Sequence, residues 1–157
     1  MNDLFLKMVL DAWRQYISRT DSLLNELSDE RLLLNIAPGK NSGKYLLGHL
    51  TAVHDRMLPL LRLGDSLYPE LHDPFELKPD GPHIRPFDMT DLRDSWKEVN
   101  DSLNAHFSRL TLDEWLERHT AVSEDDFRNE PHRNRLNVVI NRTNHLAWHY
   151  GQLLLLK

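Results

Sequence analysis

The sequence predicts an all-α fold, a four-helix bundle in which residues 1–157 form a single domain. Three observations indicate this fold. Apolar residues recur at three- and four-residue steps along four long stretches, which is typical of amphipathic helices. No stretch shows the apolar–polar alternation of a half-buried strand. A proline-rich segment separates the second stretch from the third, as expected where one long connection crosses a bundle.

The first two helices are expected over about residues 3–27 and 42–63. The first has a single apolar stripe, whereas the second is apolar on much of its surface, which is typical of a central helix. Ser42 is placed to cap the start of the second helix, and Gly64 is suited to cap its end. Pro59 lies within this span, so we expect the helix to kink there or to end early.

The segment from residue 64 to residue 89 contains five prolines and is expected to form the long crossover loop between the second and third helices. Thr90 is the expected N-cap of the third helix, which continues to about residue 110. Thr111 and Glu114 have the spacing of a capping box and predict a short helical turn after it.

Residues 120–131 are polar and acidic and are expected to form a loop, and the fourth helix follows over about residues 134–155. Trp13, Trp96 and Trp148 are expected to pack in or near the core. Trp148, which lies between two histidines, could alternatively form a wall of a site.

Composition and charge argue against several classes of function. The formal net charge is -5 and no basic block is present, which argues against nucleic acid as a main partner. No run reaches the roughly 18 apolar residues of a membrane span, and the first residues lack the pattern of a signal peptide. The chain has no cysteine, so it offers neither thiolate ligands nor a cysteine nucleophile. We expect a soluble cytoplasmic protein.

Two histidines of the fourth helix, His145 and His149, have the spacing of a metal-binding pair. Side chains four residues apart lie on one face of a helix, about 5–6 Å apart at Cβ, and can reach the same ion. Leu146 follows His145, so the glutamate of an HExxH zinc peptidase is missing and the pair has no obvious general base.

The pair needs a third ligand, and His49 is the best candidate. It lies in the most apolar helix, where an unpaired imidazole would be costly. Gly48 beside it would allow another helix or a substrate to approach closely. His54 is five residues further on and faces another direction. The carboxylate of Asp55 could substitute as the third ligand, but it is expected toward the surface.

Asn141 and Gln152 lie one turn before and one turn after the histidine pair, on a polar stripe of the fourth helix. They could bind the imidazole N–H groups, a bound water or a substrate. The alternative interpretation is a metal-free bundle in which the same histidines are buried and hydrogen-bonded.

Two motifs resemble those of the DinB-like superfamily, the damage-inducible group related to bacillithiol and mycothiol transferases. They are Gly48-His49-Leu50 and the run NHLAWHYGQ from Asn144 to Gln152, and the order of the elements extends the resemblance over nearly the whole chain. The resemblance implies an up-up-down-down four-helix bundle, usually a homodimer. It also implies a site for nickel or zinc at His49, His145 and His149.

The resemblance implies a chemistry as well, because relatives of defined biochemistry use low-molecular-weight thiols in transferase or isomerase reactions. One hypothesis is therefore a metal-dependent thiol S-transferase or hydrolase acting on a small molecule. Three histidines leave a coordination position open for water or for an external thiol. The alternative is a non-catalytic, stress-associated bundle that binds a small molecule. No catalytic residue is assigned.

Overall fold

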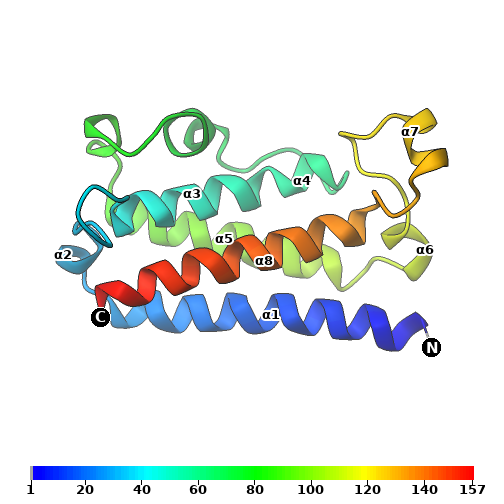
Figure 1. The fold of residues 1–157 in the computed structure, drawn as a ribbon, viewed down its shortest axis with the longest axis horizontal. Helices are drawn as coiled ribbons and strands as arrows, with labels where there is room; N and C mark the ends of the chain where they lie inside the picture. The colour runs from blue at the N-terminus through cyan, green and yellow to red at the C-terminus, as the bar shows by residue number, and fades with distance from the viewer. Residues whose placement is uncertain (1) are drawn as a thin grey trace.

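The computed structural model describes residues 2–157, and every regular element in this range is helical, which confirms the predicted all-α class (Figure 1). The long helices of the bundle are α1 (Asn2–Glu26), α3 (Gly43–Asp55), α5 (Met89–Phe107) and α8 (Arg135–Leu153). Short helices join them: α2 (Asp29–Leu32), α4 (Met57–Leu60), α6 (Leu112–Trp115) and α7 (Glu124–Asn129). No helix among residues 2–157 is both long and apolar enough to span a membrane.

Contacts at one end of the bundle fix the directions of the long helices. An ion pair between Lys157 and Glu26 places the end of α8 beside the end of α1. Gly43, the first residue of α3, approaches the side chain of Leu156. Arg93, near the start of α5, reaches the carbonyls of Leu24 in the last turn of α1 and of Leu27 just after it. Helices α1 and α8 therefore run in one direction, and α3 and α5 run in the opposite one (Figure 1).

The order along the chain is thus up-down-down-up, and the up-up-down-down order expected from the resemblance is wrong. The physical reason is the connection between α3 and α5. It returns over α3 to the end of the bundle where α3 began, so α5 starts beside the start of α3 and runs parallel to it (Figure 1). A bundle with an up-up-down-down order needs two such crossovers, and this chain has one.

The start of α3 agrees with the prediction, because the Ser42 hydroxyl accepts a hydrogen bond from the backbone N–H of Tyr45. The predicted span to residue 63 is interrupted: α3 ends at Asp55 and α4 follows as a separate turn. Pro59 has no N–H to donate to the carbonyl of Asp55, which explains the break. The C-cap of α4 is Leu61, and Arg62 after it takes the left-handed conformation that often ends a helix, with φ 58°, so the expected cap at Gly64 is wrong.

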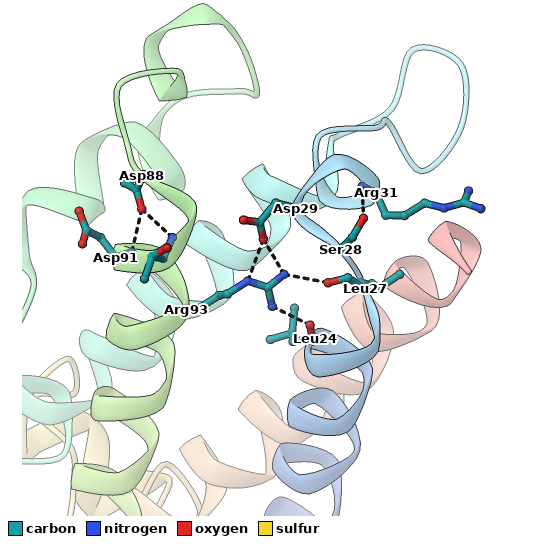
Figure 2. Close-up of polar contacts among 9 residues, drawn as sticks. Leu24, Leu27, Ser28, Asp29, Arg31, Asp88, Asp91 and Arg93 are labelled. Carbon is teal, nitrogen blue, oxygen red and sulfur yellow. Dashed lines mark hydrogen bonds and ion pairs between the residues drawn. The ribbon is translucent and has the colours of Figure 1, made fainter.

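Helix α5 begins two residues earlier than expected, because Asp88 and not Thr90 is its N-cap. The Asp88 carboxylate accepts hydrogen bonds from the N–H groups of Thr90 and Asp91 (Figure 2). A carboxylate at this position also favours the positive end of the helix dipole.

Arg93 of α5 caps the C-terminus of α1, whose own last turn has no basic residue. Its guanidinium donates to the carbonyl oxygens of Leu24 at 2.6 Å and Leu27 at 2.8 Å, and it forms an ion pair with Asp29 (Figure 2). These carbonyls have no partner within α1, so Arg93 satisfies groups that would otherwise be left to water. The contact ties the start of α5 to the end of α1.

The capping box of Thr111 and Glu114 is present at the start of α6, as predicted. Residues 120–131 are not entirely a loop, because α7 lies within them. Ser123 caps α7, and three acidic residues in its first turn favour the helix dipole. The acidic composition that suggested a loop thus marks the start of a short helix. Asn134 caps α8.

Two of the three predicted core tryptophans are buried: Trp13 is 0% exposed and Trp96 is 3% exposed. Trp148 is 70% exposed, so its assignment to the core is wrong. It lies on the outer side of α8, a face whose solvent exposure depends on which helices pack around α8 and not on its own sequence.

Candidate metal centre

Three histidines from two helices meet between α3 and α8. The Nε2 atom of His145 lies 3.2 Å from Nε2 of His49 and 3.1 Å from Nε2 of His149. One ligand atom from each ring can be chosen so that all lie within 4.8 Å of one another. Their helical spacing places His145 and His149 on the same face of α8, and the antiparallel packing of α3 brings His49 opposite them.

The outer nitrogens of two rings are held by acceptors. His49 Nδ1 lies 2.8 Å from the carbonyl oxygen of Phe75, and His149 Nδ1 lies 2.7 Å from Oε1 of Gln152. Each Nδ1 is therefore placed to donate a hydrogen, and the imidazole tautomer that does so carries a lone pair on Nε2. Both lone pairs point toward the Nε2 atom of His145.

Without a cation this arrangement cannot be fully satisfied. Nε2 of His145 can carry one hydrogen and donate it to only one of its two neighbours, so at least one lone pair faces a nitrogen without a proton between them. A divalent ion would accept all three lone pairs. Two ligands at zinc–nitrogen distance in a tetrahedral site are about 3.3 Å apart, close to the separations seen here. The residues present therefore fit a metal ion, which the cluster could hold.

The protonation states also fit metal binding. Burial, reinforced by the charges of His149, His49 and Arg142, lowers the pKa of His145 from 6.5 to about 4. Burial likewise lowers the pKa of His149, although its hydrogen bond with Gln152 opposes the shift. Both rings are neutral near pH 7, and only neutral imidazole binds a metal.

The crossover segment between α4 and α5 forms part of this site. Its short helical turn η2 (Asp73–Leu77) supplies the Phe75 carbonyl that holds His49. Phe75 packs onto Gly48, where an added Cβ would lie 2.3 Å from the phenyl ring. The ring of Tyr45 lies nearly parallel to His49 with centroids 6.0 Å apart, and its hydroxyl donates to the carbonyl of Lys78. Gly48 thus admits the crossover segment, which fixes the orientation of His49.

Of the other polar residues proposed near the histidines from the sequence, one contacts the site and the others lie elsewhere in the bundle. Gln152 contacts His149, whereas Asn141 is exposed on α8, and no hydrogen bond joins it to the three histidines within residues 2–157. His54 faces away from the site, as predicted, and its Nδ1 lies 2.8 Å from Oδ1 of Asn100 in the core.

Asp55 was expected toward the surface, and this expectation is wrong, because its side chain is 0% exposed. Its carboxylate accepts hydrogen bonds from the backbone N–H groups of Leu67 and Tyr68 and from His72. All three partners belong to the crossover segment, so Asp55 anchors the segment to the end of α3. Its burial follows from a contact 12 or more residues away along the chain and could not be inferred from α3 alone.

Two groups at the site were not predicted from the sequence. The Phe75 carbonyl is a backbone atom, and no side-chain pattern identifies it. Arg142 lies three residues before His145 and therefore on the same face of α8 as the histidines. Its helical spacing was a signal that could have placed it beside the site.

Comparison with known proteins gives one family. The family model described as the DinB superfamily matches residues 12–153, a span that includes all three histidines. Among the curated proteins, none matches the chain.

Proposed function

Because the chain belongs to the DinB superfamily, we propose that His49, His145 and His149 bind one divalent metal ion, zinc or nickel, and that the protein is a metal-dependent enzyme. The observation that carries this proposal is the convergence of the three Nε2 atoms with the hydrogens of two rings held on the opposite side. Such a ligand set leaves at least one coordination position open, which is typical of catalytic rather than structural sites.

The proposed reaction is the transfer of a small-molecule thiol or a hydrolysis. A bound divalent ion would lower the pKa of a thiol or water molecule and generate a nucleophile near neutral pH. The thiol must come from a cosubstrate, because the chain has no cysteine. Phe75 and Gln152 keep the His49 and His149 rings in the tautomer that presents Nε2 to the site.

Metal analysis tests the first part of the proposal. We expect about one zinc or nickel ion per chain in protein made without a histidine tag. His149→Ala should weaken binding at least about 100-fold, because even losing a residue that only orients a ligand costs 10–100-fold. His132→Ala is the matched control, since His132 is exposed and lies outside the cluster. A wild-type chain that takes up no metal would contradict the proposal.

Turnover tests the second part. Thiol-dependent transfer or hydrolysis should be lost with a chelator and restored by added metal, and His149→Ala should be inactive. A chain that binds metal but shows only small-molecule binding, without turnover under any of these conditions, would instead be a non-catalytic binding protein.

We further propose that the protein is a homodimer that associates through the exposed apolar side chains of α1, α8 and the residues just after α8, called here the α1/α8 face. Its members are large apolar side chains between 39% and 70% exposed: Leu4, Phe5, Met8, Ile140, Trp148 and Leu155. A shallow groove between the two helices, lined by residues such as Val9 and Ala12, lies within it. Exposed apolar patches of this kind mark interaction sites, and a two-fold axis lets one patch cover its own copy.

A further inference from the structure

Charged side chains cluster beside the three histidines, on the side toward the end of α3. Arg142 precedes His145 by one turn of α8, and Arg56 follows His49 by two turns along the same face of α3. Since the two helices are antiparallel, both arginines extend toward the same end of the site. Glu76 lies between them in the crossover segment and forms an ion pair with Arg56, with a nitrogen–oxygen distance of 3.1 Å.

Arg142 and Glu76 each have a buried polar atom without a partner. Nε of Arg142 and Oε2 of Glu76 are both inaccessible to solvent, and neither has a hydrogen-bond partner among residues 2–157. No carboxylate in this range forms an ion pair with Arg142, although the charge of Glu76 favours the charged form of the guanidinium by raising its pKa. Arg142 as a whole is only partly buried, but a buried N–H without a partner is costly, because burial removes its water without providing a substitute. The arrangement therefore favours a ligand that supplies the missing acceptor.

The balance of charge indicates the sign of that ligand. Burial lowers the pKa of Arg142 and the Glu76 charge raises it, while Arg56 acts against the charged form. Two guanidinium groups against one carboxylate leave one uncompensated positive charge, although the chain as a whole is negative. A singly charged anionic group such as a carboxylate would compensate this excess. A carboxylate also has the planar geometry that a guanidinium binds through two parallel hydrogen bonds.

We infer that Arg142 is a specificity-determining residue that binds the carboxylate of a small substrate whose thiol lies at the three histidines. This inference rests on the proposed function, since it assumes that the histidines form the reactive site. Arg56 forms an ion pair with Glu76, so the Glu76 carboxylate is shared and does not neutralise Arg142 completely. The substrate class is then a low-molecular-weight thiol that carries a carboxylate.

The test compares two thiols that differ in charge, 3-mercaptopropionate and 2-mercaptoethanol, on the full chain loaded with Ni²⁺. Binding is followed by the thiolate-to-metal charge-transfer absorption. The wild-type chain should bind the carboxylate thiol more tightly. Arg142→Gln should weaken that binding by about tenfold or more, as expected for a hydrogen bond to a charged group, and leave 2-mercaptoethanol unchanged. Arg142→Lys should give an intermediate loss of affinity, because lysine keeps the positive charge but cannot form the two parallel hydrogen bonds of a guanidinium.

Arg31→Gln is the matched control, because it removes the same charge from an exposed side chain of α2 (Figure 2). Helix α2 precedes the start of α3, whereas Arg56 follows its end. The Arg31→Gln variant should bind both thiols as the wild type does. Equal affinities of the wild type for the two thiols, or an equal loss of both in Arg142→Gln, would overturn the inference.

A second readout keeps the inference separate from the proposed function. The ¹⁵N–¹H resonance of the Arg142 Nε group, identified by its absence in Arg142→Lys, should shift on addition of propionate to the metal-free chain. A chain that binds no metal but shows this shift would refute the metal site and retain the carboxylate site. A chain that binds metal and shows no shift would refute the carboxylate site alone.

Discussion

The three histidines differ in the hydrogen-bond partner of Nδ1, the ring nitrogen that points away from the cluster. His49 is held by a backbone carbonyl and His149 by an amide oxygen, whereas the buried Nδ1 of His145 has no partner among residues 2–157. The position of His145 is therefore set by packing and by its neighbours' Nε2 atoms. A ligand ring that is not fixed by a hydrogen bond can turn slightly when an ion is bound, so His145 is where adjustment to different metals is expected.

His54, outside the cluster, makes the stability of the bundle depend on pH. Burial lowers its pKa from 6.5 to about 3, although the hydrogen bond with Asn100 opposes the shift. In the unfolded chain the same imidazole takes up a proton near pH 6.5. Between these values the unfolded state binds a proton that the folded state does not, so falling pH favours unfolding.

We therefore predict that the free energy of unfolding is highest above about pH 6.5 and that His54 lowers it by roughly 1 to 1.5 kcal/mol per pH unit as the pH falls toward 3. His54→Gln keeps a donor for Asn100 but does not titrate. Its curve, from urea unfolding of metal-free protein at a series of pH values, should be flatter than that of the wild type. Parallel curves would mean that His54 is not the responsible group.

Among the elements, the crossover segment has the greatest influence on the site. It provides the Phe75 carbonyl to His49 and Glu76 to the arginine cluster, and Asp55 anchors its beginning. A segment that looks like a connection in the sequence thus forms one wall of the candidate centre. Gly48 allows the segment to lie close to α3, because an added Cβ at this glycine would overlap the ring of Phe75.

We predict that Gly48→Ala pushes Phe75 away from α3. The added Cβ would lie 2.3 Å from the ring, so the change should destabilise the fold by about 1–3 kcal/mol. The loss of the His49 hydrogen bond should also weaken metal binding by about 10–100-fold. Urea unfolding and metal titration measure the two effects.

Gly151→Ala is the control within α8. A Cβ there meets nothing within 4 Å, so the substitution should leave metal binding unchanged and raise stability by roughly 0.5–1 kcal/mol, because alanine favours the helix. If Gly48→Ala behaves like Gly151→Ala, the close packing of Phe75 does not control the site.

At the scale of the whole molecule, the bundle buries one side of α8 at the candidate centre and leaves the large apolar side chains Ile140 and Trp148 exposed on its outer side. Phe5→Glu places a charge in the α1/α8 face and should convert the proposed dimer to a monomer, as measured by sedimentation equilibrium. Leu33→Glu adds the same charge at an apolar side chain of similar exposure outside this face and should leave the dimer intact. A wild-type chain that remains monomeric at high concentration would contradict the proposed interface.

Features that depend on neighbours in sequence could be predicted from the sequence. The helical periods, the Ser42 cap, the Thr111–Glu114 capping box and the pairing of His145 with His149 all arise within one or two turns of a single helix. Backbone geometry alone relates residues at such short spacings, so their types are sufficient to recognise them.

Only the tertiary structure decided the rest. The directions of α3 and α5, the burial of Asp55 and the exposure of Trp148 each depend on which segments pack together over long separations. The hydrogen bond from His49 to the Phe75 carbonyl involves a backbone atom that every residue has, so no residue type could reveal it. The sequence by itself therefore identified three histidines that could lie close together. Their meeting, the tautomers of His49 and His149 and the position of Arg142 beside them follow from how the helices and the crossover segment pack.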